Sequence, residues 1–283
     1  MIVPNNKIEN DIQNLLSFFN QIEFAPGLNK KEAKLELKEI SNEIRNNFKF
    51  IYNFRKERIV ASKNNWKEKL IFNLNIYING TCFRIIDFLI SLSNLHKEKN
   101  FLTSIILLRH FHETICHLFY VLDNTKNFMQ KNDFERFYKL IQTVSFEREV
   151  LFKPLHVNDT LRYFIKKFPM NEKWKHICDE AYKQASEIAH PSSLGSFEFF
   201  GKFYPNNHRF KFKEYQKVTI QKSYGYTVVM LESFNLVSGF LQSYLNEYEE
   251  LYTKMINSDI HNKYNDQMNE FNKEIFDFTK KNS

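Results

Sequence analysis

The chain has 283 residues, of which 43% are hydrophobic and 16% aromatic. This composition supports a sizeable buried core and excludes a largely disordered chain. The formal net charge of +7 is compatible with two origins, a polyanionic partner such as nucleic acid or a lysine-rich surface encoded by an A- and T-biased gene.

Hydrophobic periodicity predicts helices along the first half of the chain. The expected helices are Ile8–Phe19, Lys30 to about Lys63, Trp66–Leu95, Phe101–Leu122, Asp133–Thr143 and about Glu147–Leu151. Asn79 and Gly80 indicate a kink or break within the third of these helices. Apolar residues surround the whole of the Phe101–Leu122 helix, so we expect it to be buried on most sides.

The second half continues the helical pattern, with one segment of a different period. The expected helices are Asn158–Phe168, Glu172–Ala189, Tyr224–Met255 and His261–Lys280. Asn158 and Asp159 are the expected caps of the first. Between residues 196 and 216 the period changes, because apolar and polar side chains alternate at Phe197–Phe199 and at Arg209–Lys213, on either side of a turn at Pro205–Asn207. This pattern predicts a small β-hairpin or an extended loop.

We therefore predict an all-α fold, a single helical bundle with one hairpin insert. Residues 1–30 would form an N-terminal arm, residues 31–258 the helical domain with the insert at 196–216, and residues 259–283 a helical tail.

Cysteine usage and apolar runs indicate a soluble, cytoplasmic protein. Cys82, Cys116 and Cys178 are far apart and lack zinc-site spacing, so we expect reduced core cysteines. Residues 1–10 contain no apolar run of signal-peptide type. The two most apolar stretches, residues 82–95 and 101–122, are interrupted by charged residues, so we expect no membrane span.

Ionisable residues gather on the central helix at Arg109, His110, His112, Glu113 and His117. Arg109, Glu113 and His117 follow at intervals of four residues, which places them on one face of a helix. A buried charge is costly unless it is paired, and Arg109 and Glu113 are spaced to pair with each other. The cluster is therefore either a structural ion pair with hydrogen-bonded histidines or a functional site.

A second polar stripe lies at the end of the Glu172–Ala189 helix. Tyr182, Ser186 and His190 are spaced four residues apart, and Pro191 ends the helix. The helix dipole favours a protonated imidazole at this end. A protonatable histidine that faces an arginine suits phosphodiester chemistry, because the histidine moves protons and the arginine holds the phosphate charge. The alternative is a histidine that caps the final carbonyls.

These two patterns, Leu-Leu-Arg109-His-Phe-His-Glu113 and Tyr182-x-x-x-Ser186-x-x-x-His190-Pro-Ser, resemble a widespread family of bacterial helical proteins related to the HEPN superfamily. The resemblance covers about residues 70 to 195. HEPN proteins are helical bundles, commonly dimeric, and many are metal-independent endoribonucleases of toxin–antitoxin or phage-defence systems.

The resemblance implies a homodimer that acts on RNA without a cofactor and pairs with a regulatory or antitoxin protein. It implies that His190 is the general acid or base and that Arg109 clamps the phosphate. Glu113 would orient Arg109 or a neighbouring histidine, and Tyr182 and Ser186 would bond to the substrate or to His190. The competing hypothesis is a non-catalytic helical module that binds a protein or nucleotide and uses the cluster as a buried structural network.

Metal-ligand spacings are incomplete, so we expect no metal. His112-Glu113-x-x-x-His117 is one residue longer than the H-E-x-x-H pattern of zinc proteases. Glu187-x-x-His190 has the spacing of di-iron bundles, which need a second copy on another helix.

The predicted hairpin carries a basic strip. Arg209, Lys211 and Lys213 alternate with Phe210 and Phe212, so a strand would place the three cations on one face. Such a strip can follow a phosphate backbone, which makes these cations candidates for nucleic-acid binding. The alternative is that they protect an exposed edge strand from aggregation.

Overall fold

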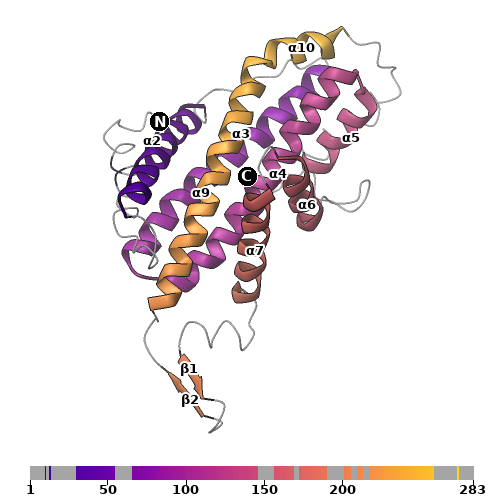
Figure 1. Cartoon of the computed structure of the whole chain (residues 1–283). Helices are drawn as coiled ribbons and strands as arrows, with labels where there is room; N and C mark the ends of the chain where they lie inside the picture. Colours follow the sequence, from indigo (N-terminus) through magenta and orange to yellow (C-terminus); the bar gives the residue numbers. More distant parts are fainter. Residues whose placement is uncertain are drawn as a thin grey trace. The chain divides into compact units, whose positions relative to one another are not determined.

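The computed structural model describes residues 30–54, 66–145, 156–168, 172–189, 201–204, 209–212 and 217–257, with the isolated positions 10, 13 and 273. Its helices are α2 (Lys30–Phe54), α3 (Trp66–Lys97), α4 (Phe101–Lys131), α5 (Phe134–Ser145), α6 (Val157–Lys167), α7 (Glu172–Ala189), α9 (Lys217–Asn246) and α10 (Tyr248–Ile256) (Figure 1). The prediction of an all-α protein is confirmed for this part of the chain.

Two short strands follow α7 in the sequence. These are β1 (Gly201–Tyr204) and β2 (Arg209–Phe212), which pair antiparallel with Lys202 opposite Lys211 (Figure 1). Their side chains lie outside the described part of the chain, so the shared face of Arg209 and Lys211 stays a prediction.

Several helix boundaries follow the sequence pattern. α7 begins and ends at the predicted residues, and α3 ends at Lys97 instead of Leu95. α4 extends beyond the predicted Leu122 to Lys131, and its last turns bury Phe128 and Met129. The helices predicted at residues 8–19, 147–151 and 261–280 lie outside the described residues, apart from the isolated helical positions.

α3 runs through Asn79 and Gly80 without a break, although this pair indicated a kink. The neighbouring Ile78 and Cys82 are fully buried. A helical glycine costs about 1 kcal/mol relative to alanine, which is less than the gain from burying two such side chains. Tertiary packing therefore overrides the local signal.

The expected caps of α6 were wrong. His156 is the N-cap residue and makes no side-chain capping bond, while Asn158 and Asp159 lie within the first turn. The His156 carbonyl accepts the backbone N–H of Asp159 and of Thr160, so the helix begins one residue earlier than predicted. Asp159 still favours this end of the helix through its negative charge.

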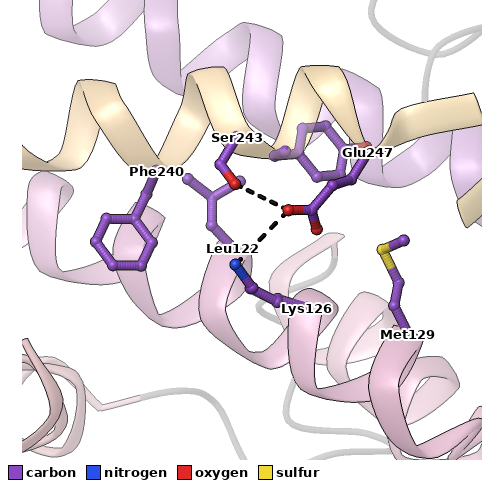
Figure 2. A pocket seen from close by; sticks show the side chains of 7 residues that line it. Leu122, Lys126, Met129, Phe240, Ser243 and Glu247 are labelled. Atoms are coloured by element: carbon purple, nitrogen blue, oxygen red, sulfur yellow. Dashed lines mark hydrogen bonds and ion pairs between the residues drawn. The ribbon is translucent and has the colours of Figure 1, made fainter. Parts of the chain in front are cut away.

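The single helix predicted at Tyr224–Met255 is in fact two helices, and the first begins earlier, at Lys217. Glu247 separates α9 from α10, with φ −93° and ψ 0°. Its carboxylate accepts a hydrogen bond from the Ser243 hydroxyl at 2.9 Å and lies 3.6 Å from Lys126 Nζ (Figure 2). These two contacts hold the side chain of Glu247 at the break, which no sequence period indicates.

The chain divides into two compact units. The first comprises residues 1–56, 80–120 and 156–239, and the second comprises residues 57–79, 121–155 and 240–283. α3, α4 and α9 each contribute residues to both units.

In the first unit, aromatic side chains of α4 and α6 form part of the core. The ring of Phe119 lies 5.4 Å from that of Phe164 and 4.9 Å from that of Phe168. All three side chains are buried, and so are Leu231 and Phe234 of α9. Full burial of each such side chain contributes about 1.5–3 kcal/mol. This packing fixes the position of α4, which carries the ionisable cluster.

In the second unit, tyrosines connect α9 and α10 to α3. The Tyr244 hydroxyl donates to Asn75 Oδ1 at 3.1 Å, and Asn75 Nδ2 donates to the Tyr248 hydroxyl at 3.1 Å. The Tyr252 hydroxyl donates to Glu68 at 3.2 Å. The three tyrosines are spaced four residues apart, so they lie along one face of α9 and α10.

The packing of α3 predicts that Gly80→Ala stabilises the protein. Gly80 is helical and exposed, and a Cβ atom added there meets nothing within 4 Å. The substitution should raise the free energy of unfolding by about 0.5–1 kcal/mol, because alanine loses less backbone entropy than glycine on folding. Chemical denaturation measures the change, with Gly239→Ala on α9 as a matched case in equally open space. A destabilised Gly80→Ala protein would show that α3 is not a continuous helix at this point.

Candidate functional site

The carboxylate of Glu113 on α4 is the centre of the ionisable cluster. Its Oε1 accepts hydrogen bonds from Arg109 Nε and from the Tyr182 hydroxyl, each at 3.0 Å. Its Oε2 lies 3.2 Å from His110 Nδ1. Arg109 and His110 reach the carboxylate because they precede Glu113 by four and three residues on one helix. Tyr182 comes from α7, so one carboxylate joins two helices of the first unit.

The cluster lies at the edge of the core. The side chains of Glu113, Arg109 and His110 are 13%, 25% and 56% exposed. Burial lowers the pKa of Arg109, but the charge of Glu113 and the nearby Tyr182 hydroxyl outweigh this effect and raise it. The guanidinium is therefore a permanent cation. Its bond to Glu113 uses Nε, one of five N–H donors in the group.

The phenol of Tyr182 is a hydrogen-bond donor in this arrangement. Its pKa is raised, first because the side chain is buried and then because Glu113 is negatively charged. The hydroxyl therefore keeps its proton and donates a hydrogen bond to Glu113. Glu113 is thus a partner of Tyr182 that the sequence pattern did not indicate.

Ser186 lies one turn after Tyr182 on α7, and its hydroxyl oxygen is buried. This oxygen has no well-aligned hydrogen-bond partner among the residues that the structure describes. It nevertheless acts on Tyr182 as a weak donor that lowers the pKa of the phenol. A hydroxyl that is near the phenol but poorly aligned with it accounts for both observations.

His112 is a fully buried titratable group beside the cluster. Its side chain is fully buried, and its ring packs edge-on against Phe164, at 5.9 Å, and Tyr182, at 5.7 Å. Neither ring nitrogen has a hydrogen-bond partner within the described part of the chain. Burial lowers the pKa of His112 to about 4, although the charge of Glu113 opposes this shift. The imidazole is therefore neutral at pH 7.

His96 is a contrasting buried histidine in the same unit. Its Nδ1 lies 3.3 Å from the Ser104 hydroxyl, and its Nε2 lies 3.3 Å from the Thr227 hydroxyl. These contacts connect α3 with α4 and α9. Burial lowers the pKa of His96 to about 4, so it too is neutral at pH 7. His96 has the partners of a structural histidine, and within the described ranges His112 has none.

The structure describes only part of the predicted site. Arg109, Glu113, Tyr182 and Ser186 lie on α4 and α7, and the first three meet at one carboxylate. His190 and Lys213 lie outside the described residues, as do the side chains of Arg209 and Lys211. The shared cleft of Arg109 and His190 therefore stays a prediction. The sequence pattern places His110 beside the cluster without indicating a role for it, although a residue three positions before Glu113 on a helix can reach its side chain.

The cysteines are buried and free at Cys82, Cys116 and Cys178, as expected. Burial raises the pKa of Cys82 to about 12 and also raises those of Cys116 and Cys178. These thiols are therefore poor nucleophiles. Among the residues that the structure describes, no group of three or more His, Cys, Asp and Glu side chains is arranged to hold a metal ion.

One helical segment within the described ranges, Leu70–Lys97, is long and apolar enough to cross a membrane by length and composition. Of its most apolar stretch, 39% is buried inside the structure. The core helix of a soluble protein passes the same test, and Arg84 and Asp87 are exposed on this helix. The absence of a membrane span stays a prediction.

A small cavity of the second unit lies beside the break between α9 and α10. Figure 2 shows its lining, which consists of Leu122, Lys126, Met129, Phe240, Ser243, Tyr244 and Glu247. Its volume is about 10 Å³, which is near the lower limit for one water molecule. It is too small for an organic ligand, so the Glu113 cluster is the better candidate for a functional site.

Comparisons of the chain with models of protein families, with curated protein sequences and with solved structures found no match. The residues around Glu113 are therefore the basis for any proposal of function.

The environment of His112 predicts a loss of stability in weak acid. Its pKa is about 4 in the folded protein and about 6.5 in an unfolded chain, so the unfolded state binds the proton more readily. The contribution of His112 to the free energy of unfolding is therefore fully present above about pH 6.5 and is lost as the pH drops toward 4. Between pH 7 and pH 5, the free energy of unfolding should fall by about 2 kcal/mol less in His112→Leu than in the wild type.

Denaturation curves at both pH values measure this difference. His176→Ala is the matched control, because it removes a histidine that is exposed on α7. Equal pH dependence of His112→Leu and the wild type would show that His112 is not buried as a neutral group.

Proposed function

We propose that this chain is a HEPN-like helical protein that acts on RNA as a metal-independent endoribonuclease. One observation carries the proposal. The largely buried carboxylate of Glu113 holds the partly exposed Arg109 and the more exposed His110 side by side. All three lie on α4, which is otherwise largely apolar. A fixed guanidinium recognises phosphate through paired N–H donors, and an imidazole moves protons. The net charge of +7 favours a polyanionic substrate.

In this proposal Arg109 clamps the phosphate that is attacked and His190 acts as a general acid or base. Glu113 holds Arg109 in place, and Tyr182 holds Glu113. Ser186, whose buried hydroxyl lies near Tyr182, bonds to the substrate or to His190. Arg209, Lys211 and Lys213 of the hairpin insert follow the RNA backbone outside the site.

The biological setting belongs to the same proposal. The protein would be a cytoplasmic homodimer of a toxin or phage-defence system, built as a single bundle with a hairpin insert and neutralised by a partner protein. The HEPN-like sequence patterns around Arg109 and His190 are the support for this setting.

The competing proposal is a non-catalytic binding module, and one observation favours it. Arg109 and Tyr182 both donate a hydrogen bond to the same oxygen of Glu113. Shared acceptors of this kind are typical of structural networks between two helices. Removal of one partner from a buried pair costs about 3–5 kcal/mol, and less for a pair as exposed as this one. The two proposals therefore differ in what the loss of Arg109 does to stability.

The nuclease proposal predicts cleavage of single-stranded RNA in the presence of EDTA. Arg109→Ala should reduce the rate about 10²–10³-fold, as expected when a group that stabilises developing phosphate charge is removed. Arg109→Lys should also be impaired, because an ammonium lacks the paired donors of the guanidinium. Gel analysis of end-labelled RNA measures both rates.

Arg162→Ala is the matched control, because Arg162 is an exposed arginine on α6 and its loss should leave the rate nearly unchanged. Melting temperatures of all variants are compared in parallel. If the wild type leaves varied RNAs intact, the nuclease proposal fails. If Arg109→Ala melts far below the wild type and Arg109→Lys restores the melting temperature, the structural proposal is favoured.

A further inference from the structure

Cleavage of RNA without a metal requires two proton movements. The attacking 2′-hydroxyl loses a proton, and the departing 5′-oxygen gains one, so one group must act as a base and another as an acid. The proposed function names one such group, His190. The role of the second group is inferred here, and it rests on that proposed function.

His110 has the surroundings of an oriented proton acceptor. Its Nδ1 lies 3.2 Å from Glu113 Oε2, so in the neutral imidazole Nδ1 carries the hydrogen and donates it to the carboxylate. This tautomer leaves Nε2 with a free electron pair. Nε2 has no hydrogen-bond partner among the described residues, and 56% of the side chain is exposed. The reactive nitrogen is therefore open to a substrate.

The same carboxylate positions Arg109. Oε1 of Glu113 accepts a hydrogen bond from Arg109 Nε, and Oε2 accepts one from His110 Nδ1. The carboxylate therefore holds both side chains next to it. A base that is held by a carboxylate, next to a cation for the developing charge, is the arrangement expected for attack on a phosphate or an acyl group. His96 and His112, which are buried in the same unit, lack this access to solvent.

We propose that His110 is the general base of this site, that Nε2 is the atom that accepts the proton, and that Glu113 is its positioning residue. The 2′-hydroxyl gives its proton to Nε2 while its oxygen forms a bond to phosphorus. The bond from phosphorus to the 5′-oxygen breaks, and that oxygen takes a proton from protonated His190. The products are a 2′,3′-cyclic phosphate and a 5′-hydroxyl, without oxidation or reduction. Arg109 binds the non-bridging phosphate oxygens throughout.

The experiment compares two forms of an RNA that the wild type cleaves. One is the natural RNA, and the other carries a 5′-bridging sulfur at the mapped cleavage position. A thiolate leaves without a proton, so the sulfur form needs the base but not the acid. His110→Ala should slow cleavage of both forms by about 10²–10⁴-fold, the range of general acid–base contributions. His190→Ala should slow only the natural RNA.

Two further measurements separate chemistry from structure. Added imidazole should restore part of the activity of His110→Ala, because the exposed position lets a free base occupy the vacated site. His110→Gln, which keeps a donor for Glu113 but cannot take a proton, should be as slow as His110→Ala. His176→Ala replaces another exposed histidine, on α7, and should retain wild-type activity.

The outcomes distinguish the role of His110 from the nuclease function itself. Full activity of His110→Ala, or its rescue by the sulfur leaving group, would overturn the assignment of His110 as the base while the nuclease function stands. A wild-type protein that cleaves no RNA would overturn the function and, with it, this role. Slow cleavage of both substrates together with imidazole rescue would support the assignment.

Discussion

The hydrogen bonds to Glu113 are the interaction on which the candidate site depends. The carboxylate receives Arg109 and His110 from its own helix and Tyr182 from α7, at 3.0–3.2 Å. Without it, a cation would lie at the edge of an apolar core with no counter-charge, and nothing described would fix the direction of either basic side chain. The negative charge of Glu113 thus neutralises the Arg109 cation and also orients Arg109 and His110, two groups that can act on a phosphate.

The surroundings of the carboxylate show that this arrangement has an energetic cost. Among the residues that the structure describes, neither nitrogen of the buried His112 has a hydrogen-bond partner, and the buried Ser186 hydroxyl has no well-aligned one. Each unsatisfied buried polar group costs about 1–3 kcal/mol. The aromatic packing of Phe119, Phe164 and Phe168 in the same unit offsets such costs. A polar set kept at the edge of an aromatic core is more typical of a functional site than of a core optimised for stability alone.

Local spacing predicted those parts of the molecule that depend on local contacts. The bounds of α7 follow from its amphipathic pattern and the proline after it, and the Arg109–Glu113 pair follows from a separation of four residues. The contact of Tyr182 with Glu113 spans 69 residues and needs two helices to pack in one register. The break at Glu247 depends on contacts with Ser243 and Lys126, the latter on another helix. No period within one segment encodes contacts of that kind, so the sequence alone could not predict them.

A double-mutant cycle between Glu113→Ala and Tyr182→Phe tests the central claim most directly, because it isolates the bond between α4 and α7. The two changes should be coupled by about 1–2 kcal/mol in the free energy of unfolding. The same cycle with Tyr226→Phe, whose hydroxyl donates to Gln184 instead, should show no coupling. Additive effects of Glu113→Ala and Tyr182→Phe, within about 0.3 kcal/mol, would contradict the account, because the carboxylate would then not join the two helices.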